Sequence, residues 1–303
     1  MELINKCRKL VKNNIKDTVD ESVIEYLTLS IVALKLTLPE NITSKLPSIL
    51  NKLNIYALNK TVLDIAHDEL GNYMEDNSLS HADAAVTRSL KIDDESKTID
   101  EDWNLLISLK KNKETHEMIG KIIHELIHLL RFNGIKQEGN NIKLLDGISN
   151  ASITLEPLTV KRKHYYLEEG IVQTYTNMAM KTLYEYLNNS KIKNNIVEEY
   201  IKEMKNYNYS DYLLETEIIK LLSNNNHINN LLVETFNEKN IPSSLANYYN
   251  NVMDDNTAFT RLSRKLDNVS NSVRDNEIEI NFKELSNEIK MFLMKSQIKK
   301  LMK

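Results

Sequence analysis

The sequence predicts a mainly α-helical protein with a small β-sheet, an α+β fold. Apolar residues recur at three- and four-residue spacing from Leu3 to about Leu58 and again from Leu167 to Lys303, which is typical of helices that bury one face. Between these regions, residues 85–92 and 103–109 are typical of short strands, separated by an acidic turn. With 303 residues, 41% of them hydrophobic, the chain can bury one large core or two modest ones.

The amino-terminal region, residues 1–75, is expected to be helical. Its pattern breaks near Asp17-Thr18 and at Leu38-Pro39, and a further helix over residues 59–73 is expected to stop around Gly71.

The central region, residues 76–187, begins with the two strands and continues with a helix over residues 114–131 that contains no proline. A loop-rich connection over residues 134–166 follows, and we expect it to form a flap or one extra strand over residues 153–158. A second helical pattern then runs from Tyr165 to about Leu187.

The carboxy-terminal region, residues 188–303, is again expected to be helical, with joints at Pro242 and at asparagine-rich stretches. Its last helix, over residues 278–302, is amphipathic, so it either docks on the preceding helices or forms an oligomer face. The sequence does not predict the oligomeric state.

The helix over residues 114–131 contains the most informative motif of the chain, His124-Glu125-Leu126-Ile127-His128. Residues four apart on an α-helix are separated by about 40° around its axis, so both imidazoles leave the same face and can bind one metal ion. Glu125 is rotated by about 100° from His124, and its carboxylate can act as a general base toward a water on that metal. The motif therefore predicts a Zn²⁺ site.

A chance match is the alternative, because the chain has 7 histidines and this pattern gives false positives. His124 and His128 would then be core histidines with ordinary hydrogen-bond partners. Beside so apolar a face, however, two neutral histidines carry a desolvation cost that a metal offsets. His116 begins a similar pattern that ends in Gly120 and lacks the second histidine, so we expect His116 to be exposed near the helix start.

A catalytic zinc needs a third protein ligand, and the best source is the run Tyr165-Tyr166-Leu167-Glu168-Glu169-Gly170. A His-Glu-x-x-His motif followed about forty residues later by Glu-Gly at a helix start resembles the gluzincin metallopeptidases. It also resembles mostly helical gluzincin-like proteins of low-GC Gram-positive bacteria. The resemblance covers roughly residues 105–177 and implies a zincin-like catalytic core, Zn²⁺ as the cofactor and Glu169 as the third ligand.

Helical periodicity alone leaves two glutamates open. Glu168 shares the apolar stripe of the second helix, which favours Glu168 as the buried carboxylate, whereas the family pattern favours Glu169. Our prediction is Glu169. Gln173, four residues later, stands where such sites often place an acidic partner of a ligand histidine, and it brings no charge to that role.

The resemblance also implies a proton donor or oxyanion stabiliser, for which Tyr212 is the first candidate because it opens a helix downstream of the glutamate helix. His164, Tyr165 and Tyr166 are further candidates through their nearness to Glu169. In zincin folds the edge strand of a small sheet pairs with extended substrate, and the strand over residues 103–109 is the predicted counterpart, with an ordinary core strand as its alternative.

These residues predict a zinc metallopeptidase that hydrolyses peptide or protein substrates, with His124, His128 and Glu169 as metal ligands and Glu125 as the general base. The alternative is a non-catalytic helical interaction protein with a structural or degenerate zinc site. The motif is similar to that of clostridial neurotoxin light chains, but the remainder of their pattern is missing. Peptide deformylases share the motif too, but they need a cysteine ligand, and Cys7 has no suitable setting.

Composition limits the partners and the compartment. A formal net charge of −4 gives no basic footprint for nucleic acid, and no apolar stretch is long enough to span a bilayer. Cys7 is the only cysteine, so no intrachain disulfide can form, and the first residues lack the apolar core of a signal peptide. We therefore expect a cytoplasmic protein, with export by a route without an amino-terminal signal as the alternative.

Overall fold

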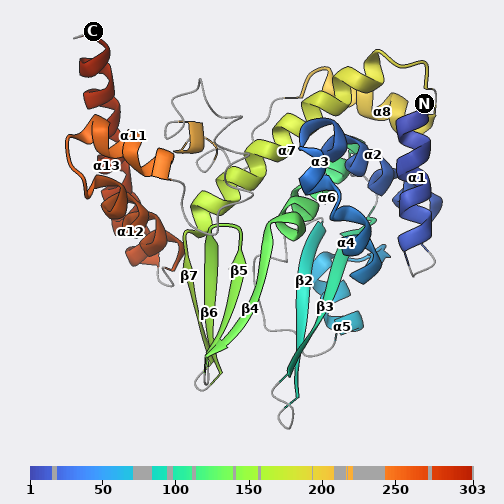
Figure 1. Ribbon diagram of the computed structural model, residues 1–303, viewed down its shortest axis with the longest axis horizontal. Helices are drawn as coiled ribbons and strands as arrows, with labels where there is room; N and C mark the ends of the chain where they lie inside the picture. Colours follow the sequence, from blue (N-terminus) through green and yellow to red (C-terminus); the bar gives the residue numbers. More distant parts are fainter. Residues whose placement is uncertain are drawn as a thin grey trace. The chain divides into compact units, whose positions relative to one another are not determined.

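The computed structural model describes residues 1–15, 19–70, 84–93, 98–110, 114–138, 141–155, 158–192, 194–207, 216, 218–220, 243–271 and 275–301. Helices and two small sheets make up these residues, which confirms the predicted mainly helical α+β class (Figure 1). The chain divides into two compact units, residues 1–130 with 175–209, and residues 131–174 with 210–303.

The first unit begins with the helices α1 (Glu2–Asn14), α2 (Glu21–Thr37), α3 (Glu40–Thr43) and α4 (Leu46–Lys52). Most side chains in the middle of α2 are buried, as its almost continuous apolar sequence predicts. Its one buried carboxylate, Glu25, forms an ion pair with Arg8 of α1 and accepts a hydrogen bond from Asn194 Nδ2 at 2.8 Å. These partners offset the cost of burying the charge.

The sheet of the first unit contains β1 (Leu53–Leu58), β2 (Ala84–Asp93) and β3 (Thr98–Ser108) in the order β1-β3-β2. β1 runs parallel to β3, and β2 pairs with β3 antiparallel. Helix α5 (Val62–Leu70) packs on Ala85 and Leu106 of this sheet. The two expected strands are confirmed, but the expectation of helix up to Leu58 was wrong over β1. The expected substrate strand, β3, is the central strand, so neither of its edges is open.

Two long helices follow the sheet in the chain, α6 (Thr115–Arg131) and α7 (Tyr165–Asn188), and α7 begins in the second unit and continues into the first. Within the first unit, Gly120 of α6 lies so close to α7 that an added Cβ would be 2.8 Å from Met180 Sδ. Glycine therefore permits the close approach of the two backbones here. Helix α8 (Asn195–Met204) is capped by Asn194, whose side chain accepts the Val197 N–H.

We expect Gly120→Leu to lower the free energy of unfolding by about 1–3 kcal/mol, because the larger side chain overpacks the contact with Met180. Gly120→Ala is the matched control: its gain in helix propensity, up to ~1 kcal/mol, opposes a clash with only the flexible end of Met180. Urea unfolding of both variants measures the difference. Equal stability of the two variants would contradict the close packing.

The sheet of the second unit is an antiparallel meander of β4 (Phe132–Glu138), β5 (Asn141–Asp146), β6 (Ser149–Leu155) and β7 (Leu158–Lys163). The expectation of a loop-rich connection, with a flap or one extra strand over residues 153–158, was therefore wrong: β4 to β7 are four consecutive paired strands. The tight turn between β5 and β6 depends on Gly147, whose φ is +56°.

Helices α11 (Ser243–Met253), α12 (Ala258–Ser270) and α13 (Asp275–Leu301) complete the described part of the second unit. Tyr249 of α11 stacks on Phe292 of α13 with ring centroids 4.6 Å apart. The buried Glu288 of α13 accepts a hydrogen bond from Lys265 Nζ of α12 at 2.9 Å. The last helix therefore docks on the helices before it, one of its two predicted roles. Asn271, just after α12, bonds the backbone N–H and C=O of Arg162 in the edge strand β7.

Candidate metal centre

Helix α6 buries its apolar stripe and thereby fixes the direction of its two motif histidines. Ile119, Ile123, Leu126 and Ile127 are fully buried, as the helical periodicity predicts. His124 is buried and His128 is half-buried, and their rings meet edge to face with centroids 4.9 Å apart. Their Nε2 atoms lie 3.2 Å apart.

This distance fits either of two interpretations. One imidazole N–H could donate to the other ring nitrogen, which is an ordinary hydrogen bond. Alternatively, two nitrogens bound to one tetrahedral zinc at ~2.0–2.1 Å are held roughly 3.3 Å apart. Both interpretations require the two rings to converge on one point, and the four-residue spacing on a helix accounts for that convergence.

Glu169 lies in the first turns of α7 and is buried. One ligand atom each from His124, His128 and Glu169 lie within 4.8 Å of one another. The chain thus contains a His/His/Glu group that could hold a metal ion. Two imidazole nitrogens and a carboxylate oxygen are a common donor set for zinc.

The neighbouring carboxylate, Glu168, is fully engaged elsewhere. Its two oxygens accept hydrogen bonds from the Arg131 guanidinium in a bidentate pair, with Nη2 to Oε2 at 2.8 Å. Oε2 also accepts the backbone N–H of Ile148 at 2.9 Å. Both Glu168 and Arg131 are buried, so this pair satisfies two charges that water does not reach. Glu168, which periodicity favoured, is therefore a structural carboxylate in the second unit.

The Glu168 pair depends on the turn at Gly147. The N–H of Gly147 donates to the Arg131 carbonyl at 3.0 Å, and its own carbonyl accepts from Asn133 Nδ2 at 3.1 Å. A Cβ at this glycine would overlap the carboxylate of Glu168. Neither Arg131 nor Gly147 was predicted to support the start of α7. The one signal in the sequence was a glycine at a turn.

Glu125 is held toward the three-stranded sheet of its own unit. Its Oε2 accepts the backbone N–H of Val86 at 2.9 Å. Val86 lies on β2, an edge strand, and its N–H points away from β3 toward α6. The predicted general base is therefore oriented by a backbone group of an edge strand. The sequence carried no signal for this contact, because a backbone N–H is present at almost every residue.

The remaining predicted site residues, Tyr212, His164, Tyr165 and Gln173, do not belong to the His/His/Glu group. Tyr212 lies outside the described residues. His164, just before α7, has a φ of +57°, and its Nδ1 lies 2.8 Å from Ser263 Oγ of α12. Burial lowers the pKa of the His164 imidazole. The Tyr165 ring lies against the Arg162 guanidinium at 5.0 Å, and Gln173 is buried.

The expectation that His116 is exposed was wrong. It is buried, its Nδ1 lies 3.1 Å from Glu203 Oε2 of α8, and its ring meets that of Tyr207 at 4.4 Å. The same carboxylate accepts the His116 backbone N–H at 2.8 Å. Position near the start of a helix indicated exposure, but α8 of the first unit covers this turn. Glu114, His116 and Glu117 form a second group with metal-ligand atoms, and its Glu114 is exposed.

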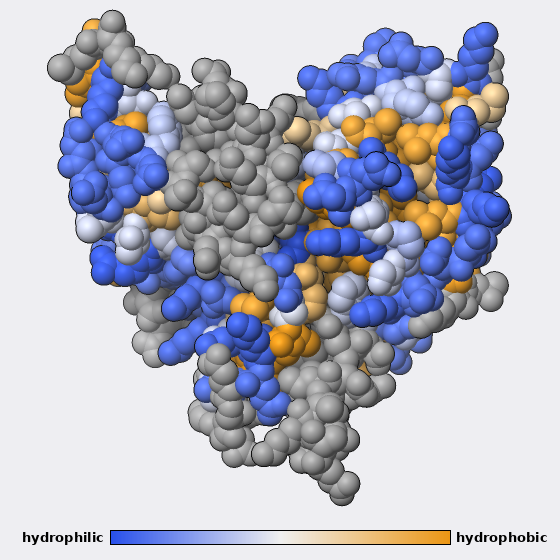
Figure 2. Space-filling model, viewed as in Figure 1, coloured by the Kyte–Doolittle hydropathy of each residue, from blue (hydrophilic) through white to orange (hydrophobic). Residues whose placement is uncertain are grey.

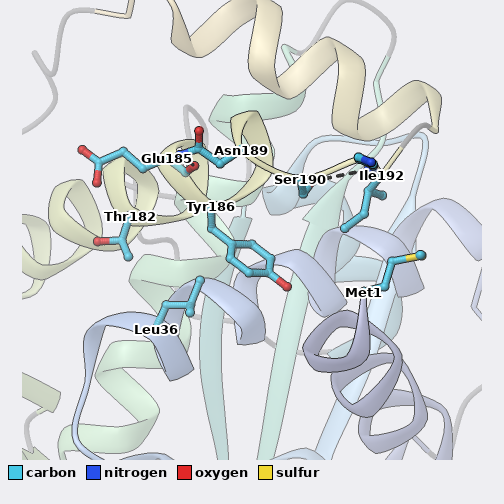
Figure 3. A pocket seen from close by; sticks show the side chains of 9 residues that line it. Met1, Leu36, Thr182, Glu185, Tyr186, Asn189, Ser190 and Ile192 are labelled. Atoms are coloured by element: carbon cyan, nitrogen blue, oxygen red, sulfur yellow. Dashed lines mark hydrogen bonds between the residues drawn. The ribbon is translucent and has the colours of Figure 1, made fainter.

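One pocket lies in the first unit, at the carboxy-terminal end of α7 (Figure 3). It has a volume of about 630 Å³ and is lined by Leu36 of α2, by Met1, and by residues of the segment 182–192 around Tyr186. None of the motif residues of α6 lines it. The pocket and the candidate metal group therefore share no residue.

In the described residues, no helix combines the length and the apolar character that a membrane span requires. No family model, curated protein or solved structure matches the chain. The functional assignment therefore depends on the motif residues and on the geometry of the His/His/Glu group.

Proposed function

We propose that the chain is a zinc-dependent peptidase in which His124, His128 and Glu169 bind the metal and Glu125 is the general base. The observation that carries the proposal is the convergence of ligand atoms from these two histidines and this glutamate to within 4.8 Å. The set supplies three protein ligands, which is the number found in catalytic zinc sites that keep a position for water.

The donor set supports zinc in particular. Imidazole nitrogen and carboxylate oxygen suit zinc, whereas calcium and magnesium prefer oxygen ligands alone. The 3.2 Å separation of the two Nε2 atoms is close to the ~3.3 Å that tetrahedral coordination imposes. Bound zinc would lower the pKa of a coordinated water to about 7 and polarise the carbonyl of the scissile bond.

Glu125 supplies the proton transfers in this proposal. Its carboxylate accepts a proton from the attacking water and delivers that proton to the amine nitrogen that leaves when the peptide bond breaks. The hydrogen bond from Val86 N–H to Oε2 supports this role, because it fixes the orientation of the carboxylate. The same contact brings the outer edge of β2 beside the base, where an extended peptide backbone could add as a further strand.

A structural or degenerate zinc site in a non-catalytic interaction protein is the second candidate. The neutral Gln173 favours it, because this buried side chain provides no negative charge to strengthen a ligand histidine. The two candidates differ in one property: a catalytic site keeps an exchangeable position, whereas a structural site is closed by four protein ligands.

The decisive test is the zinc content of the purified protein and of three variants, measured by elemental mass spectrometry. We expect about one zinc per wild-type chain and almost none in His128→Gln, because two remaining ligands hold zinc weakly. His67→Gln removes an exposed histidine of α5 and should retain the metal. Glu117→Gln disrupts the second group and should retain it as well. Zinc that persists in His128→Gln but is lost in Glu117→Gln would overturn the ligand assignment.

A hydroxamate inhibitor then separates catalysis from structure, since it needs an open position on the metal. Zinc-dependent binding, seen by calorimetry in wild type and abolished in His128→Gln, supports the peptidase. Full zinc occupancy without hydroxamate binding would favour the structural site instead.

A further inference from the structure

The four-stranded sheet of the second unit carries a row of lysines across its strands. Lys136 of β4 lies directly opposite Lys143 of β5. Ser152 of β6 continues the row between Lys143 and Lys161 of β7. Directly opposite residues on antiparallel strands point to the same face, so these four side chains lie on one face of the sheet. At ~4.8 Å between strands, the row extends over about 14 Å across the strands labelled β4 to β7 in Figure 1.

A fourth lysine, Lys163, follows two residues after Lys161 and therefore lies on the same face, which we call the lysine face. Of the strand positions on this face, only Glu138 is acidic, so four lysines and one carboxylate residue give an excess of three positive charges. Three of the four lysines are exposed, and Lys143 is half-buried. The other face of the sheet carries apolar residues such as the buried Ile142. The lysine face is thus the side of the sheet that meets solvent.

Opposed lysines lower the stability of the sheet. Like charges directly opposite on neighbouring strands repel, whereas an opposite charge at either Lys136 or Lys143 would stabilise the pair. Among the residues that the structure describes, Lys136 and Lys161 form no ion pair. A negatively charged partner on the lysine face would offset the repulsion, so the row favours the binding of an anion.

The layout of the lysine face favours an acidic polypeptide over other soluble anions. The lysines are spread along a row and do not converge on one point, so they match several spaced carboxylates better than a single phosphate group. No strand position on this face is aromatic, whereas proteins bind single-stranded nucleic acid largely through aromatic side chains on which its bases stack.

A membrane surface is a poorer match for this face. The large apolar side chains that are exposed in the described residues belong to Met1 and to α13, and some of them are visible near the carboxy terminus in Figure 2. None of these side chains belongs to the four-stranded sheet. The described part of the lysine face therefore offers no exposed large apolar side chain that could enter a lipid layer.

We propose that the lysine face binds a short acidic segment of a protein partner. In an extended chain, alternate residues lie ~6.8 Å apart on one side, so three carboxylates span the row of about 14 Å. Lysine ammonium groups would donate charge-assisted hydrogen bonds to these carboxylates. The whole chain has a net charge of −4, but charges beyond ~8 Å are screened at physiological salt, so a short segment responds mainly to the lysine face. This binding does not depend on the zinc site.

Fluorescence anisotropy of a labelled peptide of about ten alternating glutamate and serine residues tests the proposal. We expect the peptide to bind at low salt and to dissociate near 1 M salt, where the screening length falls to about 3 Å. A peptide with glutamine in place of glutamate should not bind. The titrations use the Glu125→Gln chain, so that cleavage of the probe by the proposed peptidase is not mistaken for weak binding. Equal binding of the two peptides, or no binding of either, would overturn the proposal.

Lys136→Glu separates binding from stability. It sets a carboxylate opposite Lys143, so repulsion becomes attraction and the melting temperature should stay the same or rise. The dissociation constant of the glutamate peptide should nevertheless rise at least ~5-fold. Lys290→Glu is the matched control, because it makes the same charge change on an exposed lysine of α13 in the same unit, and it should leave the constant unchanged.

Two results would contradict this partner. Equal weakening by Lys136→Glu and Lys290→Glu would show that the peptide responds to the net charge and not to the lysine face. Sedimentation of the chain with vesicles of anionic phospholipid, without binding of the glutamate peptide, would assign the lysine face to a lipid surface instead.

Discussion

Replacing Glu125 with glutamine is expected to lower peptide hydrolysis by about 10²–10⁴-fold while leaving zinc bound. A carboxamide cannot take a proton from water at neutral pH, so the transfer that cleaves the amide bond is lost. The side chain keeps its shape, and its amide oxygen can still accept the Val86 N–H that Glu125 Oε2 accepts now. The measurement is kcat/KM on a fluorescent peptide that the wild-type chain cleaves, together with zinc content.

Glu117→Gln is a suitable control, because it makes the same chemical change two turns earlier on α6 and outside the proposed ligand set. It should retain wild-type turnover. Retained turnover in Glu125→Gln would remove Glu125 from the mechanism. Loss of zinc in that variant would instead show that Glu125 supports the metal group, and would leave its role as a base open.

Local patterns predicted α6 and its motif well. The stripe of Ile119, Ile123 and Leu126 has the helical period, and a period of 3.6 over seventeen residues is hard to mistake. The convergence of His124 and His128 follows from helix geometry alone. The group that could hold a metal was therefore recoverable before any tertiary structure, apart from the choice between two adjacent glutamates.

Contacts between distant residues distinguish the two glutamates, which periodicity could not do. Glu168 and Glu169 are both buried, and the difference between them is the guanidinium of Arg131, 37 residues away from Glu168 in sequence. The meander over residues 132–163 was missed because its strands are short and mostly polar, so that pairing with neighbours and not apolar alternation defines them. His116 is buried only because α8 returns to it from 87 residues downstream.

Gly147→Ala is expected to lower the free energy of unfolding by at least ~3 kcal/mol and to weaken zinc binding. A left-handed φ of +56° costs an alanine roughly 1–2 kcal/mol. The new Cβ would also overlap the Glu168 carboxylate and force it from Arg131, and breaking a buried ion pair costs about 3–5 kcal/mol. Because Glu168 directly precedes Glu169, its displacement disturbs the turn of α7 that carries the proposed ligand. Thermal unfolding and zinc titration measure the two effects.

Gly134→Ala is the control that separates the cost of backbone strain from the cost of steric overlap. Gly134 also has a positive φ, +118°, but nothing lies within 4 Å of a Cβ built on it. Its alanine variant therefore carries backbone strain without any overlap, and the strain is at least that of Gly147→Ala, because a φ of +118° lies farther from the left-handed region that alanine tolerates. A larger loss of unfolding free energy in Gly147→Ala than in Gly134→Ala would therefore come from the Glu168–Arg131 pair. A loss in Gly147→Ala of no more than about 1–2 kcal/mol, the cost of the left-handed φ alone, would show that the buried pair adds nothing. Gly147→Ala could instead lose stability but bind zinc with wild-type affinity. The Glu168–Arg131 pair would then stabilise the second unit without positioning Glu169, and α6 and α7 themselves would hold the metal ligands.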